Sequence, residues 1–187
     1  MEKTKAKSKK QNAPTAKNLA FSALFAALCA VSTLLITVPL PNGYFNTGDV
    51  FVLLSGWFLG PIYGCFAAAT GSALADVISG YAVYAPATFV IKGLVALIAY
   101  TVYLLWKSII KRERLDFLPR LFSAICGEIV MSLGYFVYES VLFGIAGGAV
   151  SLPGNAMQGV CCLSCAVLLC SMLYPVKSLR KLFPLLK

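Results

Sequence analysis

Long apolar runs alternate with short polar or basic segments along most of the chain. The runs cover residues 18–38, 49–78, 86–106, 120–143 and 155–175. An α-helix needs about 20 apolar residues to cross the hydrocarbon core of a bilayer. The pattern therefore predicts an all-α membrane protein.

Composition supports this prediction. Of the 187 residues, 59% are hydrophobic and 12% are charged, and the mean hydropathy is +0.82. Soluble domains carry roughly 25% charged residues, and a 20 kDa soluble fold needs more polar surface than this chain provides. The length indicates one domain.

The net charge of +9 is concentrated at three places. Six basic residues precede residue 18, five lie between Lys107 and Arg120, and four follow from Lys177 onward. The loops at 39–48, 79–87 and 144–153 contain no Lys or Arg. This distribution is typical of the positive-inside rule. It predicts topology anchors at the cytoplasmic face and excludes a nucleic-acid surface.

Segments on the same side of the membrane are separated by an even number of crossings. Only three apolar runs lie between Lys17 and Lys107, so one run must be split, and Gly60-Pro61 is the expected break. We therefore expect a compact bundle of six transmembrane helices, N-in/C-in. Its parts are a disordered cytoplasmic N-terminus at 1–17, a transmembrane domain at 18–176 and a cytoplasmic tail at 177–187.

Several chemistries are absent from the sequence. The chain has no histidine and no G-x-x-x-x-G-K-[ST] phosphate loop, which excludes His-based catalysis and P-loop ATP hydrolysis. The cysteine cluster CCLSC at 161–165 lacks a fourth ligand. We expect no catalytic residue, no cofactor and no metal site.

The run at 120–143 carries a polar stripe. Glu128, Ser132, Tyr135 and Glu139 follow at steps of four, three and four, so they share one helix face. Ionisable residues at membrane depth usually face the protein interior or a water-filled cavity. The stripe is either a structural seam or the wall of a solute site.

Lys92 lies inside another apolar run. An unpaired buried charge is costly, so we expect Lys92 to pair with Glu128 or Glu139. Such a pair can be purely structural, or Lys92 or a carboxylate can bond a ligand directly.

The loops without basic residues are rich in aromatic and amide side chains. PLPNGYFNTGD brings Tyr44, Phe45 and Asn46 over the outer mouth as a possible lid, and Asp49 either caps the next helix or lines a site. Tyr81 and Tyr84 follow in the second loop. Asn155 and Gln158 stand at the expected start of the sixth helix. These residues predict a ligand pocket near the outer face that suits a small planar polar molecule.

The first helix carries a strip of small residues, namely Ala20, Ala23, Ala27 and Ala30, with Ala26 and Ala30 in a second register. Small strips allow close helix approach. The strip either packs within the bundle or docks a partner subunit.

With these residues in view, the chain resembles the substrate-binding S components of energy-coupling factor (ECF) vitamin transporters. The resemblance extends from Ala16 to Pro175. It rests on NGYFNTGDVFVLLSGWFLGPIYG, on GSALADVISGYAVYAPATFVIKG and on the Glu- and Tyr-rich fifth helix. It is closest to the riboflavin-type group, which includes proteins assigned to hydroxymethylpyrimidine or vitamin B6 uptake.

The resemblance implies a six-helix fold and a complex with a scaffold T protein and two cytosolic ATP-binding subunits. It implies docking of the T protein on Ala23 and Ala27, with Ala20 and Ala30 beside them. It also implies location in a bacterial cytoplasmic membrane and toppling of the loaded subunit in the bilayer. The implied vitamin-binding positions are Asn46, Asp49, Tyr84, Lys92, Glu128, Tyr135, Glu139, Asn155 and Gln158.

The inferred pocket polarity favours a B6 vitamer or a hydroxymethylpyrimidine, and riboflavin stays open. An alternative is a stand-alone proton-coupled carrier that uses Glu128 or Glu139, although no inverted repeat is visible. An intramembrane enzyme is disfavoured, because these two residues lie about 16 Å apart along one helix at 1.5 Å per residue.

Overall fold

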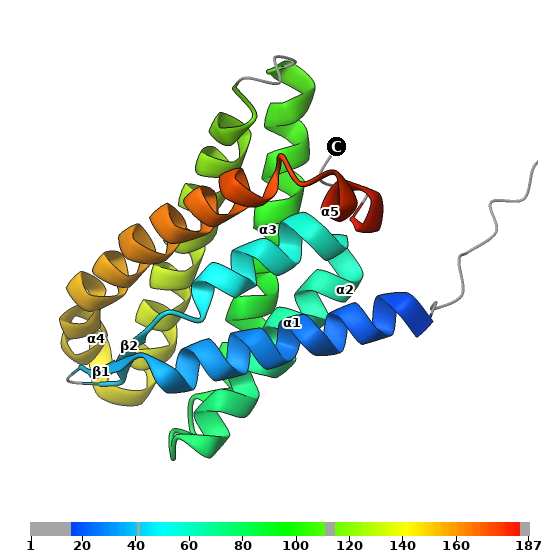
Figure 1. Ribbon diagram of the computed structural model, residues 1–187. Coiled ribbons are helices and arrows are strands. Elements are labelled where there is room, and N and C mark those ends of the chain that lie inside the picture. Colours follow the sequence, from blue (N-terminus) through cyan, green and yellow to red (C-terminus); the bar gives the residue numbers. More distant parts are fainter. Residues whose placement is uncertain (1–15, 41, 111–114, 184–187) are drawn as a thin grey trace, which may run out of the picture.

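The computed structural model describes residues 16–40, 42–110 and 115–183. Most of the predicted N-terminal segment, part of the central basic cluster and the last four residues lie outside the described residues. The elements, shown in Figure 1, are α1 (Ala16–Leu35), β1 (Thr37–Pro39), β2 (Tyr44–Asn46), α2 (Asp49–Ile78), α3 (Ala85–Ile109), α4 (Phe117–Leu173) and α5 (Lys177–Leu182).

Four helices, α1 to α4, are long and apolar enough to cross a membrane. Large apolar side chains remain exposed along them, including Leu35, Val141, Ile145 and Met172. Exposed apolar surface on this scale is unfavourable in water and favourable against lipid tails. The prediction of a mainly helical membrane protein is confirmed.

The α2 helix is interrupted where the sequence predicts a break. Gly60 has φ 80° and ψ −168°, a backbone conformation that favours glycine, and Pro61 follows it. The two halves, 49–59 and 61–78, pack closely, because a Cβ on Gly64 would lie 2.4 Å from the Ser55 carbonyl oxygen. Ser55 Oγ also donates to the Gly64 carbonyl oxygen over 3.0 Å. The predicted break at Gly60 is confirmed.

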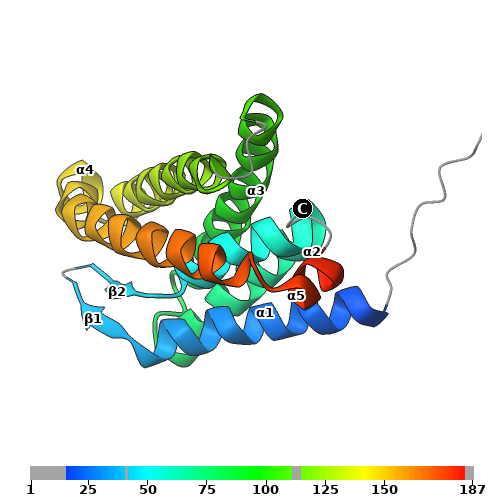
Figure 2. The ribbon, with the colours of Figure 1, turned by 45° about the horizontal axis from the view of Figure 1, so that its top comes forward.

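The α4 helix turns back at Gly144, and the prediction of a loop over 144–153 is wrong. Only Gly144 is non-helical, with φ 78° and ψ 165°, and Pro153 lies inside the helix that resumes after it. The second half (145–173) can pass close to the first (117–143), because Gly148 has no Cβ; one would lie 2.3 Å from Ser140 Oγ. Figures 1 and 2 both show this reversal, from the yellow-green first half to the orange second half.

A short hairpin interrupts the otherwise helical fold. β1 and β2 pair antiparallel, with Val38 opposite Phe45. The sequence predicts only a loop here, since two strands of three residues leave no readable alternation. The hairpin connects α1 to α2 and runs beside the second half of α4 (Figure 2).

The helices pack on a common core around Trp57. Its indole Nε1 donates to Ser123 Oγ over 3.0 Å, which joins α2 to α4. After α5, Phe183 is buried against the rings of Phe21 and Phe58. The segment from α5 to Phe183 therefore packs against the bundle at the end opposite the β1–β2 hairpin, where Figure 1 labels α5.

Helix contact between α1 and α2 depends on Gly71. A Cβ at this position would lie 2.2 Å from the Ala26 carbonyl oxygen, whereas a Cβ on Gly93, in α3, would lie 3.5 Å from the nearest atom. We predict that Gly71→Ala destabilises the protein by about 1–3 kcal/mol through overpacking. Gly93→Ala is the matched control and is expected to be neutral or stabilising. Thermal unfolding in detergent measures both, and equal melting temperatures would contradict the predicted close contact.

Candidate functional site

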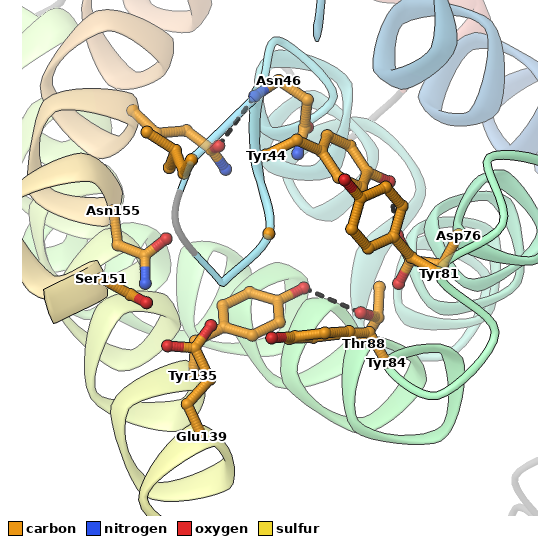
Figure 3. Close-up of a pocket in the computed structure, with 13 residues that line it drawn as sticks. Tyr44, Asn46, Asp76, Tyr81, Tyr84, Thr88, Tyr135, Glu139, Ser151 and Asn155 are labelled. Atoms are coloured by element: carbon orange, nitrogen blue, oxygen red, sulfur yellow. Dashed lines mark hydrogen bonds between the residues drawn. The ribbon is translucent and has the colours of Figure 1, made fainter. Parts of the chain in front are cut away.

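A cavity lies beneath the β1–β2 hairpin, between α2, α3 and both halves of α4. The centre of a water-sized sphere can occupy about 40 Å³ of it, so the cavity is narrow with the hairpin in this position. Its lining residues are Leu40, Gly43, Tyr44, Asn46, Asp76, Tyr81, Tyr84, Thr88, Tyr135, Glu139, Ser151, Asn155 and Gln158 (Figure 3).

Tyrosine rings form much of the cavity wall. The rings of Tyr44 and Tyr81 have centroids 4.8 Å apart, and the Tyr81 and Tyr84 centroids are 6.2 Å apart. On another side, the hydroxyls of Tyr135 and Thr88 are 2.9 Å apart and form a hydrogen bond. Flat rings on several sides present the apolar faces that stack on a planar ligand.

Two tyrosine hydroxyls tie the wall together. Tyr44 donates to Asp76 Oδ1 over 2.5 Å, and Tyr84 donates to the Asn42 carbonyl oxygen. Burial, reinforced by the bond to Asp76, raises the pKa of Tyr44 above its usual range. Tyr44 therefore remains a neutral donor, and it connects β2 to α2.

Polar atoms of three lining side chains have no hydrogen-bond partner among the residues that the structure describes. They are Asp76 Oδ2, Glu139 Oε2 and Asn155 Nδ2. Figure 3 shows Glu139 and Asn155 on one side of the cavity and Asp76 on the other. Buried polar groups are normally paired, so these atoms are available to a ligand.

The hairpin is held over the cavity by amide hydrogen bonds. The Asn46 backbone N–H donates to Gln158 Oε1 over 2.8 Å, and Asn42 Nδ2 donates to the Gly147 carbonyl oxygen over 2.7 Å. Both acceptors belong to the second half of α4. Opening the hairpin requires these bonds to break.

Lys92 forms an ion pair with Asp49, and the predicted pairing with Glu128 or Glu139 is wrong. Lys92 Nζ lies 2.6 Å from Asp49 Oδ1, and the two side chains are 3% and 0% exposed. Gln158 Nε2 donates to the other Asp49 oxygen over 2.6 Å. Asp49 makes no side-chain cap for α2. Sequence spacing on single helices gave no information about which helices face each other, which explains the wrong pairing.

Six of the nine sequence-predicted binding residues line the cavity, and three do not. Asp49 and Lys92 are not among the lining residues, although Lys92 Nζ lies 5.3 Å from the centre of the Tyr135 ring. Glu128 borders a different, apolar groove between the two halves of α4. The polar stripe predicted from Glu128 to Glu139 does lie along one helix, the first half of α4. It runs lengthwise along the bundle, so Glu139 at one end lines the cavity and Glu128 at the other end borders the groove. The six lining residues are Asn46, Tyr84, Tyr135, Glu139, Asn155 and Gln158.

The sequence-predicted site omits seven lining residues. Tyr44 and Tyr81 were expected only around the outer mouth. Thr88 and Ser151 lie four residues before Lys92 and Asn155, so helical spacing was the available signal. The remaining three are Leu40, Gly43 and Asp76.

The alanine strip on α1 is divided between two surfaces. Ala20, Ala23 and Ala27 are exposed, but Ala30 is buried and so faces no partner. The register of Ala26 and Ala30 faces the bundle, where Ala26 meets Gly71 of α2. The docking role of the strip stays a prediction, and its exposed part is Ala20, Ala23 and Ala27.

Substitution can test the buried ion pair between Lys92 and Asp49, which lies next to the cavity. Removing one partner of a buried pair costs about 3–5 kcal/mol, because the other charge is left uncompensated. We predict that Lys92→Met and Asp49→Asn each lower the unfolding temperature, and that the double variant is less destabilised than the sum of the two. A double-mutant cycle by thermal unfolding in detergent measures this coupling. Additive effects would contradict a direct pair.

Comparison with known proteins assigns the chain to a family. The family model described as "ECF-type riboflavin transporter, S component" matches residues 13–175. A protein of Pyrococcus woesei, described as an uncharacterized protein in a gap 3′ region, is 38% identical over 132 residues, which are 70% of this chain and 83% of that protein. The chain therefore belongs to the family of ECF-type riboflavin transporter S components, which are non-enzymatic membrane subunits of vitamin transport.

Proposed function

We propose that the chain captures a small water-soluble vitamin or vitamin precursor in the cavity beneath the β1–β2 hairpin. The observation that carries this proposal is the cavity itself. Four tyrosines line it, together with three polar atoms that have no hydrogen-bond partner among the described residues. The chain that contains it belongs to a vitamin-transport family. Apolar walls with a few directed polar groups are typical of small-molecule sites.

The proposed ligand is a planar heterocycle with hydroxymethyl or amine substituents, such as a B6 vitamer or a hydroxymethylpyrimidine. Tyrosine rings supply stacking surfaces, and Asp76, Glu139 and Asn155 supply acceptors and a donor. Riboflavin, which the family description names, is the second candidate. A flavin would use the same rings and would need the hairpin to open further over a larger ring system.

The proposed topology has six crossings with both termini in the cytoplasm of a bacterial cell. The non-helical residues Gly60 and Gly144 divide α2 and α4 into two segments each, which with α1 and α3 makes six. Arg120 and Glu139 are 19 positions apart in the first half of α4, about 28 Å at 1.5 Å per residue. Basic residues therefore gather about one membrane thickness from the cavity, which supports an outward-facing site.

The proposed partners are an ECF T scaffold protein and two ATP-binding subunits. Ala20, Ala23 and Ala27 leave an exposed strip on α1 where another helix can approach closely. Binding and release then follow from two states of different affinity. The Asn46–Gln158 bond would hold the hairpin closed on the ligand and break when the partner complex acts.

The first experiment is native mass spectrometry of the protein purified gently from vitamin-replete cells. We expect a co-purifying mass that matches a B6 vitamer, a hydroxymethylpyrimidine or a flavin. Calorimetric titration of the empty protein with the same compounds then measures the affinity. A protein that purifies empty and binds none of these compounds would overturn the proposed function.

The docking surface gives a second prediction. Ala23→Trp combined with Ala27→Trp should abolish cellular uptake and leave ligand binding in detergent unchanged, because tryptophan blocks close helix approach without touching the cavity. The matched control is Leu168→Trp with Met172→Trp, two exposed positions four residues apart on α4. Normal uptake by the α1 variant would contradict the docking assignment.

The alternative function, a proton-coupled carrier, predicts a different result. It would be favoured by uptake that needs no ATP-binding subunit and collapses with an uncoupler.

A further inference from the structure

The charges around the cavity are one-sided. Two carboxyl side chains, Asp76 and Glu139, line it, and none of the described lining residues is Lys or Arg. Lys92 is engaged with Asp49 at 2.6 Å and does not line the cavity. An anion that enters this space therefore loses its hydration without meeting a cation.

The unpaired atoms are deeply buried and lie on opposite sides of the cavity. Glu139 and Asp76 are 3% and 5% exposed, and each has one carboxyl oxygen without a hydrogen-bond partner in the described part of the chain. Asn155 is 8% exposed, and its Nδ2 donor has no partner there either. Figure 3 places Glu139 and Asn155 together, from the two halves of α4, and places Asp76 across the cavity on α2.

The two sides differ in what they can bind. Glu139 and Asn155 together offer an acceptor beside a donor, which complements a ligand edge that carries a donor beside an acceptor, as in an aminopyrimidine. On the other side, one oxygen of Asp76 accepts from Tyr44, and the second oxygen is left for a ligand donor. A ligand that donates to Asp76 thereby contacts a residue bonded directly to the hairpin.

We propose that the cavity selects neutral or cationic heterocycles that present hydrogen-bond donors at both ends, and that it excludes their phosphate esters and carboxylate derivatives. The selection rests on the proposed vitamin-capture function. Its physical basis is that the two carboxyl groups meet ligand donors favourably, whereas a phosphate or carboxylate would face two carboxyl groups and no cationic lining residue, with Asn155 Nδ2 as the unpaired donor.

The test uses ligand pairs that differ by one phosphate. Pyridoxine is compared with pyridoxine 5′-phosphate, and riboflavin with riboflavin 5′-phosphate, by calorimetric titration of the purified full-length protein. We expect the unphosphorylated member of any binding pair to bind at least about tenfold more tightly, since like-charge juxtaposition carries a large penalty. Equal or tighter binding of the phosphate ester would overturn the selection.

Variants test whether the lining carboxyls are responsible. Glu139→Gln and Asp76→Asn should each weaken binding of the unphosphorylated ligand. Each should also reduce the ratio of the dissociation constant of the phosphate ester to that of the unphosphorylated ligand. Glu128→Gln is the matched control, because Glu128 is equally buried but does not line the cavity. The assignment of the selection to Glu139 and Asp76 would be overturned if their variants left this ratio of dissociation constants unchanged. It would also be overturned if Glu128→Gln reduced the ratio equally.

The same titrations separate this selection from the function on which it rests. Binding of a phosphate ester in preference to the free vitamin would overturn the selection and leave vitamin capture standing. Absence of binding by all four compounds and by a hydroxymethylpyrimidine would overturn vitamin capture itself. Wild-type protein alone distinguishes these results, so the test does not depend on the variants folding.

Discussion

The buried ion pair between Asp49 and Lys92 is the interaction on which the site depends. It joins α2 to α3, and Gln158 extends it to α4 by bonding the second Asp49 oxygen. Gln158 also accepts the Asn46 backbone N–H, so the hairpin, α2, α3 and α4 share one polar network. Isolated charges are strongly disfavoured at membrane depth, and this network gives both Asp49 and Lys92 a partner. It fixes how four elements meet directly beneath the cavity.

Two glycine reversals determine which residues reach the cavity. Gly60 and Gly144 both have positive φ, and each allows a long helix to fold back on itself. The turn at Gly144 brings Glu139 together with Asn155 from the opposite half of α4. Small residues next to each turn, such as Gly64 and Gly148, then allow the paired halves to approach closely. The polar wall of the cavity therefore depends on these two helix reversals as well as on the side chains that line it.

The sequence predicted the membrane class, the break at Gly60 and the family, because apolar run length and the Gly-Pro pair are local signals. It also identified Tyr135 and Glu139 from helical spacing. It missed the partner of Lys92, since pairing between helices depends on their rotation and height, which no single run encodes. It mistook 144–153 for a loop, because glycine and proline usually mark breaks and here a single glycine makes the whole turn. Thr88 and Ser151 were missed since small hydroxyl residues are common in membrane helices.

The turn at Gly144 has a consequence for how this fold diversifies. Three polar lining residues, Glu139, Ser151 and Asn155, come from one stretch of 17 consecutive positions around it. That stretch contains neither member of the Asp49–Lys92 pair nor the exposed alanines of α1. The proposed ligand-binding groups on this side of the cavity therefore lie in one short stretch that evolution or a protein engineer could exchange between related chains. The Asp49–Lys92 pair that holds the helices together would stay the same when the substrate changes. The exposed alanines of α1, which are the proposed docking face, would stay the same as well.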